Sequence, residues 1–222
     1  FPHMVERCVI IASTTKLSAQ ALGFESVGRR MIVSDPEFYG GDYYDRPSSM
    51  PQFNGKGPVH GLSHARQLAH ITYLSAVALE KKHARRRQHP PDPARFQTGF
   101  AVESYLKHQG EKFLLRFDAN SYLHITWAMD QFDLEAEYGS LPEAFSRVQA
   151  EVLNINLSSD WLFPPPESRV ISMELLNQRK VISSVELDAP YGHDGFLVRE
   201  MPDLAEVISR FLREENGTDH AE

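Results

Sequence analysis

The sequence predicts an α/β fold whose middle part is a helical insertion. Three stretches, at 5–12, 152–157 and 181–187, are short, apolar and rich in β-branched residues, and each runs into a polar loop. Between the first and second stretches, apolar residues recur at helical spacing. Because one helical segment at 167–178 separates the second and third stretches, we expect parallel strands in a single sheet.

The helical middle determines the expected domain division. We expect helices at 17–34, 62–82, 100–109, 111–117, 120–132 and 140–148, a long loop at 39–59, and a closing helix at 203–214. The expected division is 1–60 for a core strand, helix and loop, 61–149 for the helical insertion, and 150–222 for the C-terminal strands and helices.

Composition excludes several classes of protein. The 222 residues are 41% hydrophobic and 24% charged, which is typical of a soluble globular chain. A net charge of −7 argues against a general nucleic-acid binder. Cys8 is the single cysteine, so no intrachain disulfide can form, and no Cys/His spacing predicts a metal site. The sequence has no apolar stretch near the ~20 residues of a membrane span. We therefore expect a cytoplasmic protein without membrane contact.

Two polar residues directly follow predicted strands. Asp160 comes after the second stretch and His193 after the third. In an open α/β sheet, functional groups collect beyond the carboxyl ends of the strands. A carboxylate there can orient an imidazole, which then takes a proton from a nucleophile, as in a hydrolase triad. Spacing alone leaves a second interpretation open, in which Asp160 caps a turn and His193 is merely solvated.

Longer runs of sequence carry a family resemblance. The chain resembles the homoserine O-acetyltransferase family in SSDWLFPP and YGHDGFL around these two residues, and in the runs at 34–44, 61–75 and 103–130. The resemblance covers nearly the whole chain in the right order. It implies the C-terminal portion of an α/β-hydrolase fold with an inserted helical lid.

The resemblance also implies roles for five residues. Asp160 would be the orienting carboxylate and His193 the general base. Arg66 would grip the carboxylate of the amino-acid substrate, since guanidinium pairs bidentately with it. Tyr73 would line the same pocket, and Asp194 would hold the substrate amine. Without the resemblance, Arg66 would be a surface arginine, Tyr73 a core aromatic residue and Asp194 a turn cap.

The implied reaction is transfer of an acetyl group from acetyl-CoA to the side-chain hydroxyl of L-homoserine, a step of methionine biosynthesis. The family uses a ping-pong Ser-Asp-His mechanism, needs no permanently bound cofactor, and forms a homodimer through the lid helices. The alternatives are a homoserine O-succinyltransferase or serine O-acyltransferase of the same family, a serine hydrolase of the same fold, and an inactive remnant that only binds.

The sequence departs from the family pattern at the nucleophile. It contains no Gly-x-Ser-x-Gly elbow, so we expect the serine, with the N-terminal half of the fold, to lie outside this chain. We expect the chain alone to be inactive. The strand at 5–12 would then present an apolar edge, and we expect another segment or chain to cover it; an uncovered edge would argue against this strand.

A basic cluster at Lys81, Lys82, His83, Arg85, Arg86 and Arg87 allows two interpretations. It could bind nucleic acid or the phosphates of CoA, or it could be a solvated helix end, where cations suit the helix dipole. The sequence favours the solvated helix end.

Overall fold

The computed structural model describes residues 2–46, 57–199 and 201–213. It divides the chain into two compact units. The sheet unit combines Phe1–Lys16 with Asp133–Glu222, and the helical unit is Leu17–Phe132. Part of the loop expected at 39–59, namely 47–56, lies outside the described residues, as does the last residue of the closing helix expected at 203–214.

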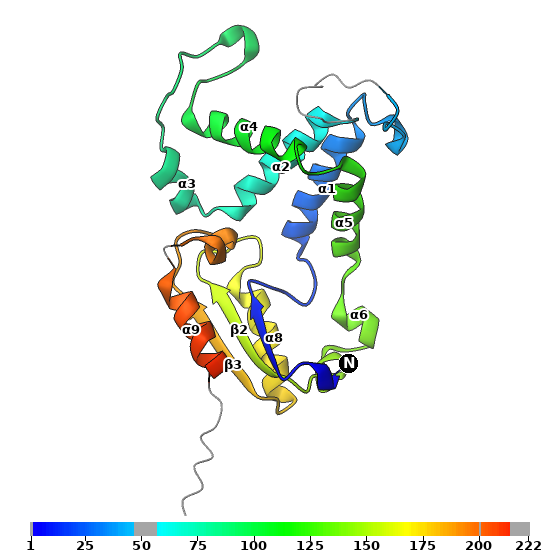
Figure 1. Cartoon of the computed structure of the whole chain (residues 1–222), viewed down its shortest axis with the longest axis vertical. Helices are drawn as coiled ribbons and strands as arrows, with labels where there is room; N and C mark the ends of the chain where they lie inside the picture. The colour runs from blue at the N-terminus through cyan, green and yellow to red at the C-terminus, as the bar shows by residue number, and fades with distance from the viewer. Residues whose placement is uncertain (1, 47–56, 200, 214–222) are drawn as a thin grey trace, which may run out of the picture. The chain divides into compact units, whose positions relative to one another are not determined.

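The sheet unit contains three parallel strands in the order β1-β2-β3 (Figure 1). They are β1 (Arg7–Ile11), β2 (Glu151–Leu157) and β3 (Ile182–Leu187). β2 is the central strand, and six of its seven residues are buried, so its apolar run contributes to both faces of the sheet. The three strands predicted from the sequence are confirmed to within two residues at each end.

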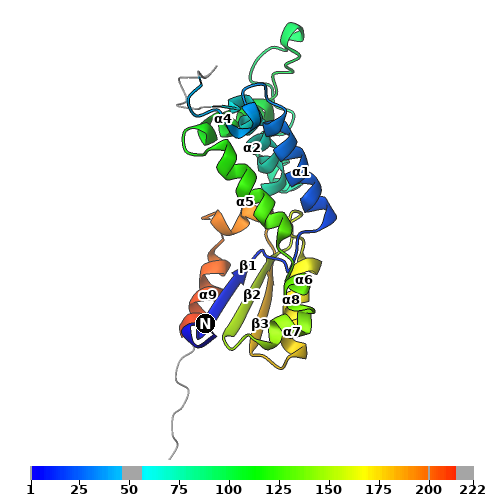
Figure 2. The same ribbon diagram turned by 90° about the vertical axis from the view of Figure 1, so that its right-hand side faces the viewer.

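One helix covers each face of the sheet (Figure 2). α8 (Pro165–Asn177) packs on Val152, and α9 (Pro202–Arg213) packs on the next residue, Leu153. Successive side chains of a strand point to opposite faces, so this alternation places the two helices on opposite sides. Asn154 lies fully buried on the α8 face, where its Nδ2 donates to the Ser168 carbonyl oxygen at 2.9 Å.

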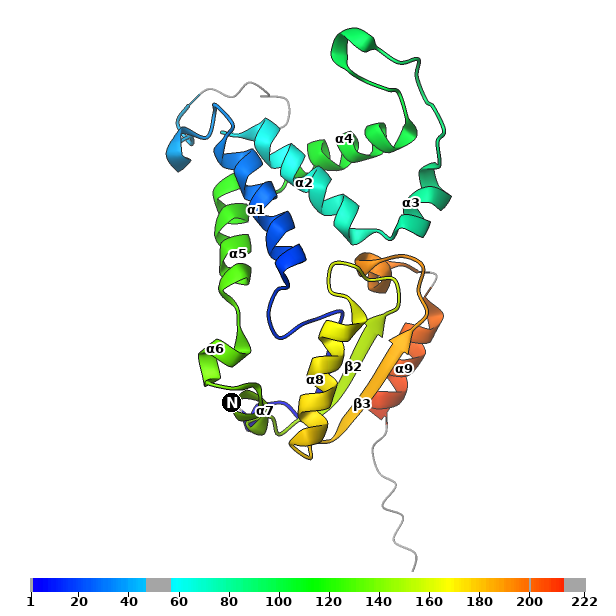
Figure 3. The same ribbon diagram turned by 180° about the vertical axis from the view of Figure 1, so that it is seen from behind.

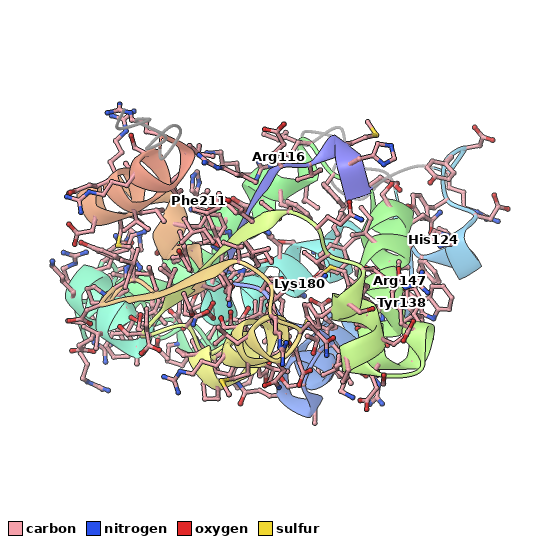
Figure 4. All side chains as sticks on the ribbon, turned by 90° about the horizontal axis from the view of Figure 1, so that it is seen from below. Arg116, His124, Tyr138, Arg147, Lys180 and Phe211 are labelled. Atoms are coloured by element: carbon pink, nitrogen blue, oxygen red, sulfur yellow. The ribbon has the colours of Figure 1, made fainter. Side chains whose placement is uncertain are left out.

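Two short helices connect the helical unit to β2 in the sequence. They are α6 (Leu134–Tyr138), which the sequence pattern does not predict, and α7 (Leu141–Ser146), and α7 packs against α8. Figure 4 labels two residues of this region, Tyr138 and Arg147, and the Arg147 guanidinium lies 5.0 Å from the Tyr138 ring centroid. The labelled Lys180 donates to the Ser146 carbonyl oxygen at 2.7 Å, which ties the turn before β3 to α7.

β1 forms one edge of the sheet. Among the residues that the structure describes, no strand pairs with its outer side, and all five of its residues are half-buried. The strand is present all the same, in parallel register with β2 from Arg7 opposite Glu151 to Ile11 opposite Ile155. The strand placement is therefore confirmed, and covering of its outer edge by another segment or chain stays a prediction.

The helical unit consists of α1 (Ala19–Val33), α2 (Val59–Tyr73), α3 (Ala76–His83), α4 (Ala101–Leu114) and α5 (Ala119–Gln131). Short 3-10 turns lie at Tyr39–Gly41 and Pro93–Arg95. Figure 3 shows α2 between α1 and α4, and these are its two main packing partners. A shared core contains Ile32, Tyr43, Val59, Leu62, Ala65, Phe113, Leu114, Ala119 and Tyr122.

Two helix boundaries differ from the expectation. The single helix expected at 62–82 breaks after Tyr73, because Leu74 is extended and the Ser75 hydroxyl caps α3 by accepting from the Ala78 N–H at 2.9 Å. The two helices expected at 100–109 and 111–117 are one continuous helix, α4, which runs through Gly110.

Glycine at two positions permits the close approach of these helices. A Cβ on Gly61 would lie 2.4 Å from the Met31 carbonyl oxygen of α1. A Cβ on Gly110 would lie 2.8 Å from the Ser63 carbonyl oxygen of α2. Both distances are shorter than van der Waals contact, so the α1–α2 and α2–α4 crossings depend on the missing side chain.

The two compact units differ in extent from the expected division. The helical insertion is expected at 61–149, whereas the helical unit begins at Leu17 and ends at Phe132. α1 belongs to it because α1 packs on α2, and α7 belongs to the sheet unit because it packs on α8. The domain division expected from the sequence stays a prediction.

Candidate active site

Asp160 and His193 form a hydrogen-bonded pair beyond the carboxyl ends of β2 and β3. His193 Nδ1 lies 2.8 Å from Asp160 Oδ2. An ionised carboxylate only accepts, so Nδ1 carries the proton that it donates to Asp160. In the neutral imidazole, Nε2 then holds the lone pair and is the atom able to take a proton from a hydroxyl. The two residues that the sequence places after successive strands are thus brought together in one site.

The Asp160 carboxylate is held in a fixed position by the turn that follows β2. The residue is 3% exposed. Its Oδ1 accepts from the backbone N–H groups of Leu162 at 3.0 Å and Phe163 at 2.9 Å. The two interpretations from the sequence are therefore compatible, because one oxygen caps the turn while the other orients the imidazole. A buried carboxylate needs such partners to offset its desolvation.

The backbone and two aromatic rings orient His193. Gly192, just before it, has a φ of 84°, a conformation that favours glycine. His193 begins the 3-10 turn His193–Leu197, and its ring meets Phe163 and Phe196 edge-on, with centroids 5.0 and 5.9 Å apart. Its side chain is 14% exposed.

Two serines between β2 and Asp160 fasten the loop that carries His193. The Ser159 hydroxyl donates to the Ala189 carbonyl oxygen and accepts from the Gly192 N–H, the latter at 2.9 Å. The Ser158 hydroxyl donates to Asp188 Oδ1 at 3.0 Å and accepts from the Ala189 N–H at 3.1 Å. Sequence reasoning missed this role. The only signal was the position of both serines at a strand end that faces the next loop.

Arg66 and Tyr73 lie together on α2 of the helical unit. Arg66 NH1 donates to the Tyr73 hydroxyl at 3.4 Å, and the guanidinium lies 4.7 Å from the Phe113 ring centroid and 5.2 Å from that of Tyr73. Within the described part of the chain, the buried Arg66 Nε has no hydrogen-bond partner. The role of Arg66 as a carboxylate grip stays a prediction.

A histidine next to Arg66 escaped the sequence analysis. His70 Nδ1 lies 3.3 Å from the Tyr105 hydroxyl of α4. Burial, followed by the positive charges of Arg66, Lys82 and Arg116, lowers the pKa of His70 to about 4. His70 is therefore neutral at physiological pH and adds a polar but uncharged group to this part of the helical unit.

Asp194 directly follows His193 in the 3-10 turn of the sheet unit. Its predicted contact with a substrate amine stays a prediction, as do the catalytic roles of Asp160 and His193. Each of the five site residues is described within its own unit, with Arg66 and Tyr73 in the helical unit and the others in the sheet unit.

The described residues show neither a nucleophile elbow nor a metal cluster. Ser63 follows a Gly-x pattern, but it lies inside α2, where its hydroxyl accepts from Gln67 Nε2 at 3.3 Å. Within the described ranges, no three His, Cys, Asp or Glu side chains are grouped so that they could bind a metal ion. Among the helices that the structure describes, none is both long and apolar enough to cross a membrane.

Curated relatives are named as acyltransferases of homoserine. No family model matches the chain. It is 46% identical over 215 residues to homoserine O-acetyltransferase of Acidiphilium cryptum, covering 96% of this chain and 54% of the relative. It is 45% identical over 202 residues to homoserine O-succinyltransferase of Bordetella pertussis, covering 89% and 47%. The chain therefore spans about half the length of the curated relatives it matches.

Solved structures give the same fold. Homoserine O-acetyltransferase of Bacillus anthracis superposes with a TM-score of 0.81 at 22% identity, covering 96% of this chain and 54% of that one. Esterase E22 superposes with a TM-score of 0.79 at 19% identity, covering 96% and 55%. These likenesses show the fold alone, as part of an α/β hydrolase. In sequence, the chain is similar to about half of the homoserine O-acyltransferases named above.

Proposed function

We propose that this chain supplies the acid–base and acceptor-binding half of a homoserine O-acyltransferase that moves an acetyl group from acetyl-CoA to L-homoserine. The Asp160–His193 pair, joined at 2.8 Å beyond two parallel strands, carries the proposal. Homoserine as the acceptor is supported by the relatives, which are named as homoserine O-acyltransferases. In this proposal the serine nucleophile lies outside the 222-residue sequence.

His193 handles protons in both halves of the proposed reaction. The serine hydroxyl gives its proton to His193 Nε2 and attacks the thioester carbonyl carbon. The C–S bond then breaks, and the departing CoA sulfur takes the proton from Nε2. Homoserine next gives its hydroxyl proton to Nε2, and its oxygen attacks the acyl-serine. The proton returns to the serine oxygen as the ester product leaves. Asp160 stabilises the imidazolium throughout.

Acceptor recognition needs one cation and one anion, because homoserine is a zwitterion. Arg66 is the proposed partner of the substrate carboxylate, since a guanidinium pairs bidentately with a carboxylate and the buried Arg66 Nε has no partner among the described residues. Tyr73 is hydrogen-bonded to this guanidinium and orients it. Asp194, adjacent to the base, is the proposed partner of the substrate amine.

The acyl group is the least constrained part of the proposal. Relatives of nearly equal identity are named for acetyl and for succinyl transfer. Acetyl transfer is preferred because the DWLFPP run at 160–165 resembles the acetyl-transferring branch. Succinyl transfer is the second candidate, favoured by the Bordetella relatives. A cytoplasmic location and a homodimer formed through the lid helices belong to the same proposal.

A chimera tests the proposal directly. This chain replaces the matching segment of the Acidiphilium cryptum enzyme, and transfer to homoserine and to serine is measured with acetyl-CoA and succinyl-CoA. We expect acetyl transfer to homoserine, abolished by His193→Ala. A folded chimera without any acyl transfer contradicts the function. A preference for succinyl-CoA or for serine selects the corresponding alternative.

A second experiment uses the 222-residue chain alone, without any segment of the Acidiphilium cryptum enzyme. Incubated with acetyl-CoA and analysed by mass spectrometry, it should carry no acetyl-serine, because it has no nucleophile elbow. A stably acetylated serine would show that the nucleophile lies within this sequence. Hydrolysis of simple acetyl esters by the chimera, without transfer to homoserine, would favour the serine hydrolase.

A further inference from the structure

A strongly basic surface lies at the end of α3 and on the segment after it. We call Lys81, Lys82, Arg85, Arg86 and Arg87 the basic surface; all five are exposed. The whole chain carries a net charge of −7, so this concentration of cations opposes the overall charge. The sequence favours a solvated helix end, and the structure gives three observations against that interpretation.

The first observation is that the arginines lie beyond the helix on ordered backbone. α3 ends at His83, and Arg87 forms an antiparallel bridge with Phe100. The Ala101 N–H donates to the Arg86 carbonyl oxygen at 2.8 Å, and the Gln88 N–H donates to the Gly99 carbonyl oxygen at 2.9 Å. The segment is thus paired with the start of α4, and the dipole of α3 does not account for cations placed there.

The second observation is that aromatic rings hold three of the cationic groups. Lys82 Nζ lies 4.1 Å from the Tyr105 ring centroid. The guanidinium carbons of Arg85 and Arg87 lie 5.0 and 4.6 Å from the centroid of one ring, Phe100. Such contacts restrict long side chains that would otherwise be mobile, and they bring two like charges to the same ring.

The third observation concerns the neighbouring charges. Within the described residues, none of the five cations has an acidic partner within ion-pair distance, whereas Lys107 and Arg95 in the same unit have one each. The nearby Glu103 carboxylate instead accepts from the Thr98 hydroxyl at 2.8 Å and from the Gly99 N–H at 2.8 Å. Burial, with the charges of Lys82 and Arg86, lowers the pKa of His83, which also reflects local positive potential.

We propose that the basic surface binds the phosphate groups of the acyl-CoA donor. This rests on the proposed function, which supplies a donor with a diphosphate and a 3′-phosphate. Guanidinium groups bind phosphate oxygens in pairs, and two of them prearranged on Phe100 form a compact anion site. A long nucleic acid fits less well, because the acidic remainder of the chain repels it beyond this one turn.

Binding of CoA to the 222-residue chain tests the proposal by isothermal calorimetry. We expect CoA to bind more tightly than dephospho-CoA, and pantetheine, which has no phosphate, to bind least. The double variant Arg85→Glu/Arg87→Glu should weaken CoA binding about tenfold or more, and added salt should weaken it further. The control Arg30→Glu/Lys112→Glu makes the same charge change at two exposed positions elsewhere in the helical unit and should change binding less than about twofold.

Several outcomes overturn the proposal. They are absence of CoA binding, equal binding of pantetheine and CoA, equal effects of the two double variants, and displacement of CoA by a single-stranded oligonucleotide that binds more tightly.

The acyl-transfer chimera separates this site from the proposed function. Transfer with an unchanged KM for acetyl-CoA in Arg85→Glu/Arg87→Glu overturns the phosphate site and leaves the function standing. CoA binding that requires both arginines, without any acyl transfer, supports the phosphate site and overturns the proposed function. A raised KM for acetyl-CoA with a nearly unchanged kcat supports both.

Discussion

The two units position their functional side chains by different means. In the sheet unit, hydrogen bonds to backbone and serine groups fix Asp160 and the His193 loop at two successive strand ends. In the helical unit, Arg66 lies among the rings of Tyr73 and Phe113 and keeps a buried donor without a partner among the described residues. The sheet unit therefore presents a preorganised, hydrogen-bonded Asp–His pair. In the helical unit, contacts with aromatic rings hold the Arg66 guanidinium instead.

Asp160→Asn, made in the chimera, should have the largest effect of the changes considered. The Asn carbonyl oxygen can still accept from the turn after β2, so its amide NH₂ faces His193 Nδ1. That contact favours the tautomer with the proton on Nε2, which cannot accept one. We expect kcat/KM to fall about 10³- to 10⁴-fold with little change in thermal stability. Activity within tenfold of the parent chimera would contradict the role of the pair.

The sequence predicts where some residues of these two units lie, but it does not predict all of their contacts. Asp160 and His193 each follow the end of a parallel strand. The order of the strands is therefore sufficient to predict that both lie beyond the same edge of the sheet. The hydrogen bonds of Ser158 and Ser159 depend on side-chain direction, which hydrophobic patterning does not specify. The break after Tyr73 had a local signal in Ser75, but the Ala-rich pattern at 62–82 outweighs one capping residue.

Gly110 shows the opposite conflict between local preference and tertiary packing. Glycine interrupts a predicted helix there, yet α4 continues because the close contact with α2 has no room for a side chain. The family resemblance, rather than any pattern, directs attention to Arg66, since a lone arginine on a helix is otherwise unremarkable.

Gly110→Ala tests whether helix packing maintains the helical unit. The new methyl group would lie 2.3 Å from Ser63 Oγ and 2.8 Å from the Ser63 carbonyl oxygen, so α2 and α4 must separate. We expect a loss of about 1–3 kcal/mol in the free energy of unfolding, measured with urea. Gly23→Ala is the matched control, because a Cβ there has no neighbour within 4 Å and should add about 0.5–1 kcal/mol. Equal effects would show that crossing distance is unimportant.

Ser159→Ala tests the hydrogen-bonded fastening of the sheet unit. It removes the acceptor of the Gly192 N–H and the donor to the Ala189 carbonyl oxygen, and Ala189 is fully buried. We expect a loss of about 1–2 kcal/mol in stability, together with a changed His193 imidazole resonance in NMR spectra. Ser158→Ala should cost less, because that hydroxyl is exposed and water can replace it. An unchanged His193 resonance would show that the hydrogen bonds of Ser159 do not affect the position of His193.

His70 offers the smallest and most selective test. Its pKa is lowered from 6.5 to about 4 in the folded chain, so in this pH window the unfolded chain binds more protons. Stability should therefore fall as pH decreases from about 6.5 towards 4. His70→Gln should reduce this dependence, measured as the urea midpoint at pH 7 and pH 5. Part of the slope should persist, because the pKa of His83 is lowered too. His64→Gln, at an exposed position on the same helix, should leave the slope unchanged. If both variants behave alike, burial of His70 between α2 and α4 does not determine the pH response of the helical unit.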